Sequence, residues 1–551
     1  MIDDKPYQVP SLQAPIELHL EGNEASLPPP TLPLAPDHVR RYQTPAALEA
    51  LLAEQLHLPA ARVLVTAGGD DGLDRVFRAL LQPDQTVVLT APTFDMIERF
   101  ARLARGRLVR VPWLTGAFPT TEFLAHVTAD TGVMVVVTPN NPTGLAVPLE
   151  VLGRLSEAAP HATLLVDMAY SEFAAEDPTD LVTSLPNSVM IRTLSKAWGF
   201  AGLRVGYAVA DVSRIAAMRI AGPPYPCAGP SLAMAAYRIT YQRPEVDAFI
   251  TQVTHERHAL IALLKDLGAE PWASEANFVL ARFPHADWVW RGLAGLGIAV
   301  RAFPTHPILS DTLRMTCPGE PAWFKRLTDG LQSVLRPQAI LFDMDGVLAD
   351  VSDSYRKAII ETAAHYKVTL THADVSAAKA GGSANNDWDL TWRLLAERGA
   401  TATLPEVTER FEGLYQGGLW TNERLLVEKQ FLHDLARRYP VAIVTGRPRA
   451  DAVRFLGQHG LSDVFQHLVC MEDAALKPDP APVRKALEVL NVSRAWMVGD
   501  TPDDVTAARR AGVVPIGIPS PTDNPAELTE ALHRAGAAVV LQRLSDLERY
   551  W

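Results

Sequence analysis

The sequence predicts an α/β protein with two successive units, each organised around a buried parallel sheet. In the first part of the chain, short apolar runs end in polar or turn residues, and helical segments separate them. Such runs are typical of parallel strands covered on both faces. The runs span residues 86–92, 133–144, 163–170, 189–196 and 205–209. A second series begins at Ala339, and a length of 551 residues is too great for one ordinary domain.

The composition favours small-molecule chemistry. Apolar residues make up 48% of the chain, and 51 basic residues against 63 acidic ones give a net charge of -12. Because nucleic-acid binding needs a basic surface, the charge argues against it. Three distant cysteines, Cys227, Cys317 and Cys470, predict neither disulfides nor a zinc site.

The N-terminus lacks the apolar segment of a secretory leader, and no run of about 18 apolar residues occurs. We therefore expect a cytoplasmic protein without a membrane partner.

The chain begins with a proline-rich arm, residues 1 to about 40, which contains Asn23 in the string LEGNEAS. A helix is expected over 46–58, and a strand over 63–66 leads into AGGDDG and a further helix. Glycines and a helix N-terminus suit an anion, so Gly69 and Asp70 are candidates to hold a phosphate through their main-chain amides. A plain glycine-rich turn is the alternative.

One lysine, Lys196 in RTLSKAWGFAGLR, lies among residues that can bind a phosphate: Thr193, Ser195 and Arg204. Such a lysine can form a Schiff base with a cofactor aldehyde, and the neighbouring donors suit the cofactor's phosphate. An ordinary surface lysine is the alternative if the stretch is taken alone.

Other strand ends supply the remaining groups that a pyridoxal phosphate site needs. Asp167 can pair with a pyridinium nitrogen, while Asn141 and Tyr170 can hydrogen-bond the ring oxygen. Phe94 offers a face for ring stacking. Each also has a structural alternative, as a turn residue or a core aromatic.

Together GGDDG, PNNPTG, DMAY, RTLSKAWGFAGLR and LRMT resemble the fold-type I aminotransferases, and in particular the histidinol-phosphate aminotransferases, over about residues 10–335. The resemblance implies a large α/β domain (about 41–222) and a small α+β domain (the arm and about 223–335). It makes Lys196 the Schiff-base lysine and proton shuttle. It makes Arg314 the ligand of the glutamate carboxylate and of the substrate phosphate, with Asn23 bordering the substrate.

Family members are dimers in which a tyrosine reaches the neighbouring subunit's cofactor phosphate, and Tyr42 in RRYQTP matches that position. Three departures concern the substrate pocket: Met168 replaces a glutamate, Phe94 stands where tyrosine is common, and the arm reads GNEAS instead of NENP.

After a short linker, LRPQ at 335–338, an apolar strand delivers Asp343 and Asp345 in AILFDMDGVLAD. Later strand ends carry further polar groups in a fixed order: Thr445, Lys477, Asp500 and Asp504. Carboxylates that converge at strand ends suit Mg²⁺, and a lysine beside them suits a phosphoryl group.

This second set resembles the phosphatases of the haloacid dehalogenase superfamily, over about residues 338–551. The resemblance implies a Rossmann-like domain in which Asp343 is the nucleophile and Asp345 the general acid and base. Thr445 and Lys477 would bind the phosphoryl group. The Mg²⁺ ligands would be Asp343, the carbonyl of Asp345, and Asp500, supported by Asp504. Residues of about 350–439 would form a helical cap. Its loop at 380–388 is a specificity candidate, with a solvated loop as the alternative.

The two resemblances lead to one hypothesis, a bifunctional enzyme of histidine biosynthesis. It would transaminate imidazole acetol phosphate with glutamate and hydrolyse a phosphomonoester, histidinol phosphate being the candidate. One alternative is a phosphothreonine decarboxylase-like or other aminotransferase fused to a phosphatase of unrelated esters. Another is that one half is a non-catalytic module.

Overall fold

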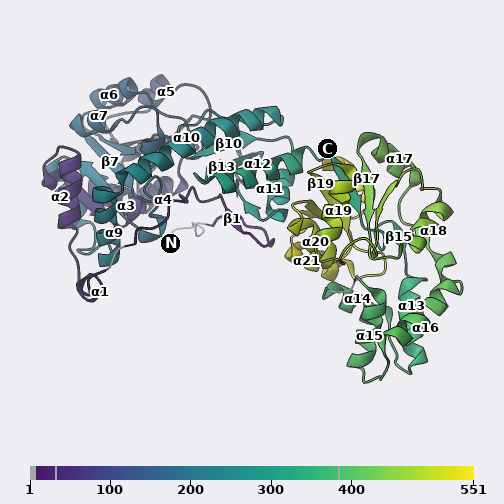
Figure 1. Cartoon of the computed structure of the whole chain (residues 1–551). Coiled ribbons are helices and arrows are strands. Elements are labelled where there is room, and N and C mark those ends of the chain that lie inside the picture. Colours follow the sequence, from purple (N-terminus) through teal and green to yellow (C-terminus); the bar gives the residue numbers. More distant parts are fainter. Residues whose placement is uncertain (1–7, 32–33, 383–384, 551) are drawn as a thin grey trace. The chain divides into compact units, whose positions relative to one another are not determined.

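The computed structural model describes residues 8–31, 34–382 and 385–550, which form two compact units (Figure 1). Unit 1 contains Leu20–Phe283 and Thr312–Lys325 together with residues 8–9. Unit 2 contains Pro10–His19, Pro284–Asp311 and the described residues from Arg326 onwards. Among the described residues, no helix has both the length and the apolar character needed to cross a bilayer.

Unit 1 is built on a seven-stranded mixed sheet. The strands, in spatial order, are β2 (Val63–Thr66), β8 (Gly206–Ala210), β7 (Ser188–Thr193), β6 (Thr163–Asp167), β5 (Thr131–Val137), β3 (Thr86–Ala91) and β4 (Arg107–Pro112). Neighbouring strands are parallel except β8, which is antiparallel to both β2 and β7. Every residue of β5, β6, β7 and β8 is buried, which explains why their sequences are continuous apolar runs.

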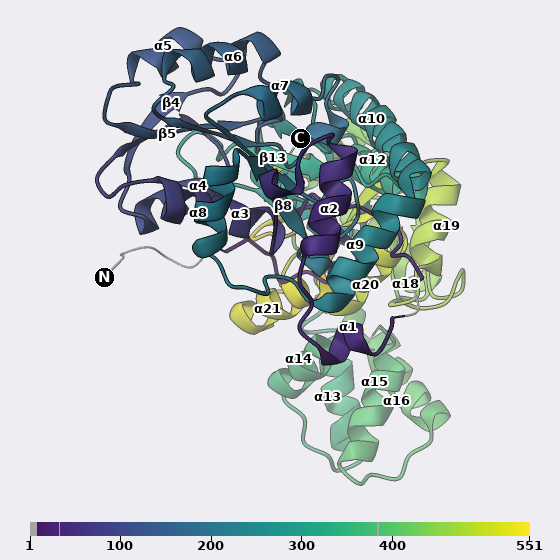
Figure 2. The same cartoon turned by 90° about the vertical axis from the view of Figure 1, so that its left-hand side faces the viewer.

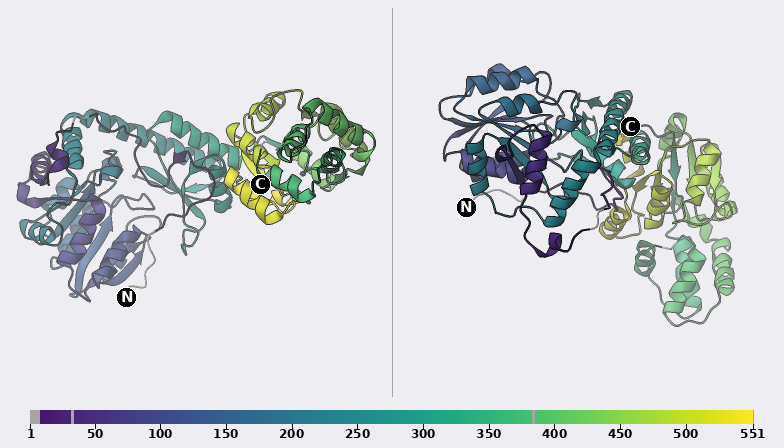
Figure 3. Two further views of the ribbon diagram at one scale, coloured as in Figure 1. Left: turned by 90° about the horizontal axis from the view of Figure 1, so that it is seen from below. Right: turned by 60° about the vertical axis from the view of Figure 1, so that its left-hand side comes forward.

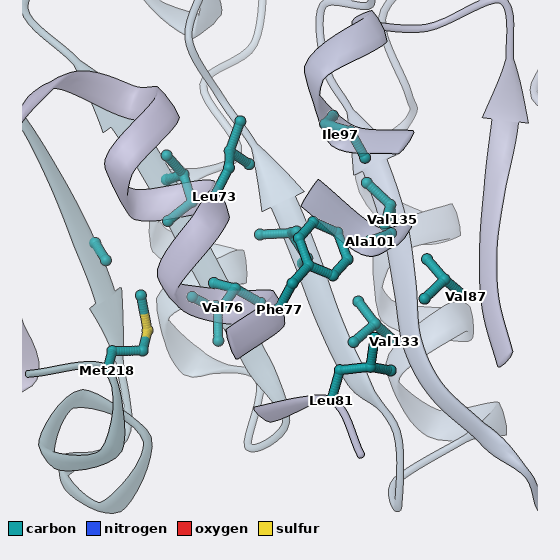
Figure 4. Packing of buried hydrophobic residues seen from close by; sticks show 14 of the residues in the cluster. Leu73, Val76, Phe77, Leu81, Val87, Ile97, Ala101, Val133, Val135 and Met218 are labelled. Atoms are coloured by element: carbon teal, nitrogen blue, oxygen red, sulfur yellow. The ribbon is translucent and has the colours of Figure 1, made fainter. Parts of the chain in front are cut away.

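The main core of unit 1 lies between α3 (Gly68–Leu80) and this sheet (Figure 4). Apolar residues of α3 recur at positions 73, 76, 77 and 80, so one stripe of the helix faces the strands. The stripe contacts Val87, Val133 and Val135 of the strands, and α4 (Asp95–Leu103) and α8 (Val212–Ile220) complete the cluster.

The other helices of unit 1 are α1 (Asp37–Arg40), α2 (Ala46–Gln55), α5 (Thr120–Ala125), α6 (Leu149–Ala158), α7 (Thr179–Ser184), α9 (Gly229–Tyr241) and α10 (Arg243–Asp266). Three further strands, β13 (Thr312–Thr316), β10 (Phe278–Arg282) and β9 (Glu270–Pro271), pair antiparallel in that order. Arg314 lies in the middle of β13, opposite Leu280.

Unit 2 is built on a six-stranded parallel sheet. Its strands, in spatial order, are β18 (His467–Val469), β17 (Val441–Val444), β14 (Ala339–Phe342), β19 (Ala495–Gly499), β20 (Val514–Gly517) and β21 (Val539–Val540). The strand of this sheet that comes first in the sequence, β14, lies between β17 and β19. The carboxyl ends of these three strands therefore meet at one place. An open α/β sheet binds its ligand where the strand order reverses in this way. The accompanying helices are α17 (Lys429–Arg438), α18 (Arg449–His459), α19 (Ala481–Leu490), α20 (Pro502–Arg510) and α21 (Pro525–Ala535).

Between β14 and β17 the chain forms a separate group of helices, shown in green in Figures 2 and 3. Its members are α13 (Tyr355–His365), α14 (His372–Ala380), α15 (Asp387–Glu397) and α16 (Leu404–Gln416). Two short antiparallel strands, β15 (Ala349–Asp350) and β16 (Arg424–Leu425), connect this cap to the sheet.

Unit 2 also contains segments that precede β14 in the chain. They are β1 (Leu18–His19), α11 (Ala286–Gly295), β11 (Ile298–Ala299) and the later part of α12 (Pro321–Leu335), and β1 pairs with β11. Trp288 of α11 is 2% exposed, and its ring centroid lies 4.9 Å from that of Trp496 and 4.6 Å from that of Tyr550. The indole of Trp496 donates to the carbonyl of Ser333 at 2.9 Å. The sheet of unit 2 therefore shares one core with α11 and α12.

Candidate active sites

Unit 1 contains a cavity of about 410 Å³ at the carboxyl ends of β5, β6 and β7, beside the start of α3. Twelve of the site residues expected from the sequence line it: Asn23, Gly69, Asp70, Phe94, Asn141, Asp167, Tyr170, Thr193, Ser195, Lys196, Arg204 and Arg314. These residues come from the arm, the strand ends and β13, and the fold brings them to one place.

Lys196 follows β7 and extends its amine into this cavity. Its Nζ donates to the carbonyl of Gly22 at 3.0 Å and lies 5.6 Å from the centroid of the Tyr170 ring. The hydroxyl of Tyr170 accepts a hydrogen bond from the amide of Asn23 at 3.0 Å. The arm therefore fixes both the lysine and the tyrosine.

Asp167 ends β6 as a buried carboxylate with little compensation. Its pKa is raised to about 7, mainly by burial; Asp70 also raises it, while a hydrogen bond from the Ala169 amide and the charge of Lys196 lower it. A buried carboxylate with few protein groups to balance its charge is suited to pair with a cationic ring nitrogen. Asp167 therefore fits a pyridinium.

The start of α3 forms an anion cradle. No side chain caps its first turn, so main-chain N–H groups remain available there. Thr193 donates to the Ser195 hydroxyl at 2.8 Å, and Arg204 lies 3.5 Å from Ser195 and 3.0 Å from Asp70. Gly68 has φ +80, and a Cβ there would lie 2.6 Å from Arg204 Nη2, so this approach requires glycine. Two hydroxyls, a guanidinium and free amides fit a phosphate.

Arg314 faces the same cavity from β13. It donates to the side-chain oxygen of Asn141 at 2.5 Å and to the carbonyl of Glu21 at 2.7 Å. The sequence reasoning did not single out Glu21, although the cavity includes it and it precedes Asn23 by two residues in the arm. Tyr42 does not line the cavity of its own chain; it is 83% exposed and stacks on Tyr225 at 4.8 Å.

The second site lies where β14, β17 and β19 end. Carboxylate oxygens of Asp343, Asp500 and Asp504 all lie within 4.8 Å of one another, and all three residues are buried. Lys477 Nζ donates to Asp343 at 2.8 Å and contacts Asp504. Burial raises the pKa of Asp343 to about 7, and burial and Asp504 raise the pKa of Asp500 well above its usual range. One lysine does not balance three carboxylates, so these residues fit a divalent cation.

Thr445 and Asp345 flank this group. Thr445 directly follows β17, and its hydroxyl accepts from the Arg447 amide at 3.2 Å. The carboxylate of Asp345 is not among the three clustered acids, because Arg447 binds it at 2.5 Å. The sequence reasoning missed Arg447; its place two residues after Thr445, at a strand end, was the available signal.

A small pocket extends from Asp345 toward the cap. It is lined by Asp345, Tyr355, Asn385, Asn386, Asp387, Trp388, Gly446, Arg447, Pro448 and Met471. Asn385 donates to Asp503 at 2.9 Å and to the carbonyl of Lys477 at 3.2 Å, which ties the cap to the hydrolytic site. Ser383 and Ala384, in the loop expected to contribute to specificity, lie outside the described residues.

The fold agrees with comparisons to known proteins. The chain belongs to the class I and II aminotransferases, whose family model matches residues 34–330. Residues 337–512 match the haloacid dehalogenase-like hydrolases, so a hydrolase domain follows the aminotransferase region. The family resemblance and the fold class predicted from the sequence are confirmed, and the family implies pyridoxal phosphate as the cofactor.

Within this class, the chain is similar to histidinol-phosphate aminotransferases. It is 33% identical to one from Chlorobium phaeovibrioides over 51% of this chain and 79% of that protein. It is 32% identical to one from Xylella fastidiosa over 58% of this chain and 90% of that protein. The solved histidinol-phosphate aminotransferase of Sinorhizobium meliloti in complex with pyridoxal-5'-phosphate has the same fold over 58% of this chain and 91% of its own, with TM-score 0.52 and 23% identity.

A different relative is an imidazoleglycerol-phosphate dehydratase of Phytophthora nicotianae. It is 47% identical over 225 residues, 37% of this chain. The match spans half the length of that protein.

Proposed function

We propose that the chain is a bifunctional enzyme that forms histidinol phosphate by glutamate-dependent transamination of imidazole acetol phosphate and hydrolyses a phosphomonoester, histidinol phosphate itself. The observation that carries the proposal is that both sites are assembled in one chain. Lys196, Asp167 and Arg314 line one cavity, and Asp343, Asp500 and Lys477 meet at the other. The names of the relatives, two histidinol-phosphate aminotransferases and an imidazoleglycerol-phosphate dehydratase, support this substrate class.

In the transamination, Lys196 Nζ moves the proton at the substrate Cα. Pyridoxal phosphate, when bound, supplies a ring that stabilises negative charge at that carbon. Asp167 would hold the ring nitrogen, Asn141 and Tyr170 its oxygen, and Phe94 its face. The cradle of Gly69, Asp70, Thr193, Ser195 and Arg204 would hold the phosphate. Arg314 would bind the carboxylate of glutamate in one half-reaction and the substrate phosphate in the other.

In the hydrolysis, an Asp343 oxygen attacks phosphorus while the bond to the leaving alcohol breaks and Asp345 gives that alcohol its proton. Asp345 then takes a proton from water, which attacks the aspartyl-phosphate and releases inorganic phosphate. Thr445 and Lys477 bind the phosphoryl oxygens. Asp343, Asp500 and the Asp345 carbonyl would hold Mg²⁺, with Asp504 in support, and the ion would neutralise phosphoryl charge.

The pocket beyond Asp345 favours an aromatic alcohol as the leaving group. Arg447 is the one cation among its described lining residues, and Asp345 and Glu423 already neutralise it. A carboxylate on the substrate would therefore lack a counter-ion here. The Tyr355 and Trp388 rings instead suit an aromatic alcohol. The Asp387 carboxylate in this pocket is already paired with Lys379 at 3.1 Å.

We also propose that the enzyme is a homodimer in which Tyr42 contacts the cofactor phosphate of the other subunit. The exposure of Tyr42 on a surface with Tyr225, which is 45% exposed, supports a partner there. Light scattering coupled to size-exclusion chromatography would give the mass of a monomer if the proposal fails.

The two activities can be tested in one assay. The purified protein receives histidinol phosphate, 2-oxoglutarate, pyridoxal phosphate and Mg²⁺, and glutamate and free phosphate are followed. Lys196→Ala is expected to abolish glutamate formation and to spare phosphate release, and Asp343→Asn is expected to do the reverse. If neither product forms from histidinol phosphate, the substrate assignment is wrong. Release of CO2 from phosphothreonine would support a decarboxylase instead.

A further inference from the structure

Arg447 lies next to the proposed acid and base of the hydrolase, and its environment is unusual for an arginine. Its side chain is 1% exposed, in the turn after β17. Its Nε donates to Asp345 Oδ1 at 2.5 Å, and its Nη1 donates to Glu423 Oε2 at 2.9 Å. A buried cation held between two carboxylates is costly to assemble and needs well-defined geometry.

Glu423 belongs to the cap side of unit 2. It lies between η4 (Leu419–Asn422) and β16, one of the two strands that connect the cap to the sheet. Its other oxygen accepts from Ser354 Oγ at 3.0 Å and from the Tyr415 hydroxyl at 3.1 Å. Since Ser354 directly precedes α13 and Tyr415 lies in α16, the position of Glu423 follows that of the cap.

Two aromatic rings fix the orientation of the guanidinium. The Tyr355 ring, from the cap helix α13, lies 4.9 Å from Arg447 Cζ, and the Phe455 ring, from α18, lies 5.5 Å from it. The Tyr355 hydroxyl donates to Asp451 of α18 at 2.9 Å, which holds that ring in place. A planar guanidinium in this setting can direct one N–H at Asp345 and another at Glu423, which a lysine amine cannot reproduce.

We propose that Arg447 is a positioning residue for Asp345, and that it sets the Asp345 carboxylate for proton transfer only while the cap is seated and Glu423 is in place. The inference rests on the proposed phosphatase function. Arg447 holds Oδ1 of Asp345, which leaves Oδ2 to exchange the proton with the leaving oxygen and later with water. Arg447 itself neither gives nor takes a proton. A cap that moved away would withdraw Glu423 and the Tyr355 ring, so on this inference the placement of the acid depends on the seated cap.

The test compares two esters that differ in their need for an acid. The alkoxide that leaves histidinol phosphate must be protonated, whereas p-nitrophenolate leaves p-nitrophenyl phosphate without a proton. Arg447→Met is expected to lower kcat for histidinol phosphate by about 100-fold, the usual contribution of a placed general acid, and to change kcat for p-nitrophenyl phosphate by less than about 3-fold. Arg447→Lys, which keeps the charge, is expected to recover part of the loss.

Arg356→Met is the matched control. Arg356 is also 1% exposed, and it joins the cap helix α13 to Asp523 through two hydrogen bonds of 2.8 and 2.9 Å, without contact to Asp345. Arg356→Met removes an equally buried arginine but leaves the hydrogen bonds of Arg447 to Asp345 and Glu423 in place, so kcat for the two esters is expected to change by a similar factor. If Arg447→Met lowers kcat for both esters by the same factor, the inference is overturned.

A variant that does not fold, and a protein that is not a phosphatase, can each be told apart from a failure of the inference about Arg447. If Arg447→Met does not fold, as judged by circular dichroism, Glu423→Gln replaces it. The same preferential loss of kcat for histidinol phosphate is then expected. An equal loss of kcat for both esters would count against the inference. If the wild-type protein hydrolyses neither ester, or Asp343→Asn hydrolyses both unchanged, the phosphatase proposal itself fails.

Discussion

Trp288 offers a direct test of the shared core of unit 2. The residue lies within the segment that matches the aminotransferases, yet its ring packs on Trp496 of the hydrolase sheet and on Tyr550 near the end of the chain. At 2% exposure it is almost fully buried. Trp288→Ala is therefore expected to destabilise the hydrolase, although it lies outside the hydrolase match.

The size of the effect follows from the buried area. An indole of roughly 200 Å² at about 25 cal/mol per Å² corresponds to about 5 kcal/mol, and substitutions of buried tryptophan by alanine cost about 3–5 kcal/mol. The hydrogen bond from its indole to the Val334 carbonyl, 3.3 Å long, is lost as well. At roughly 2–4 °C per kcal/mol for a unit of this size, the inactivation midpoint should fall by about 6–20 °C.

The assay is residual phosphatase activity on p-nitrophenyl phosphate after heating at a series of temperatures. Trp323→Ala is the control, since Trp323 in α12 is 46% exposed and its loss is expected to change stability by less than about 1 kcal/mol. If the phosphatase midpoint of Trp288→Ala equals that of the wild type, the shared core does not stabilise the hydrolase.

Three further predictions follow from the two sites. Because burial raises the pKa of Asp167 from 3.8 to about 7, the cofactor-free protein holds an extra proton between these values, so its stability should fall as pH rises from about 4 to about 7. Melting temperatures across that range should show this slope in the wild type and a flatter one in Asp167→Asn; identical slopes would contradict it. Gly346 has φ +73 and a Cβ there would collide with Asp500, so Gly346→Ala should abolish the rise in melting temperature that Mg²⁺ gives the wild type. Trp388→Ala should raise KM for histidinol phosphate several-fold and leave KM for a small acyl phosphate such as acetyl phosphate nearly unchanged, because the ring lines the leaving-group pocket; equal changes would remove Trp388 from substrate recognition.

The fold class and most of the candidate site residues could be predicted from local sequence patterns. Strand-end polar residues such as Asp167 and Asp343 can be read from the sequence, because an apolar run followed by an acid predicts both the strand and the position of the side chain at the sheet edge. The cavity of unit 1 assembles those residues together with Asn23 and Arg314, which come from distant segments.

What the sequence did not predict depends on pairs of distant residues. Nothing in the local sequence distinguishes Arg447 and Glu423 from other arginines and glutamates. Their role became visible only in the fold, where the turn after β17 and the segment before β16 bring Arg447 Nη1 within 2.9 Å of Glu423 Oε2. Glu21 gave no signal of its own because a glutamate in an arm is usually solvated. The contact between Trp288 and Trp496 likewise required the packing of α11 on the second sheet.

That packing has a consequence for how such a protein can be divided. A gene cut at residues 335–338, where the two family matches part, would give a hydrolase whose Trp496 faces water and whose indole N–H has lost the Ser333 carbonyl. The fragment would be prone to aggregate through that bare aromatic face. A hydrolase that survives alone would need new polar residues on this side of its sheet, or would have to keep α11 and the end of α12 as its own.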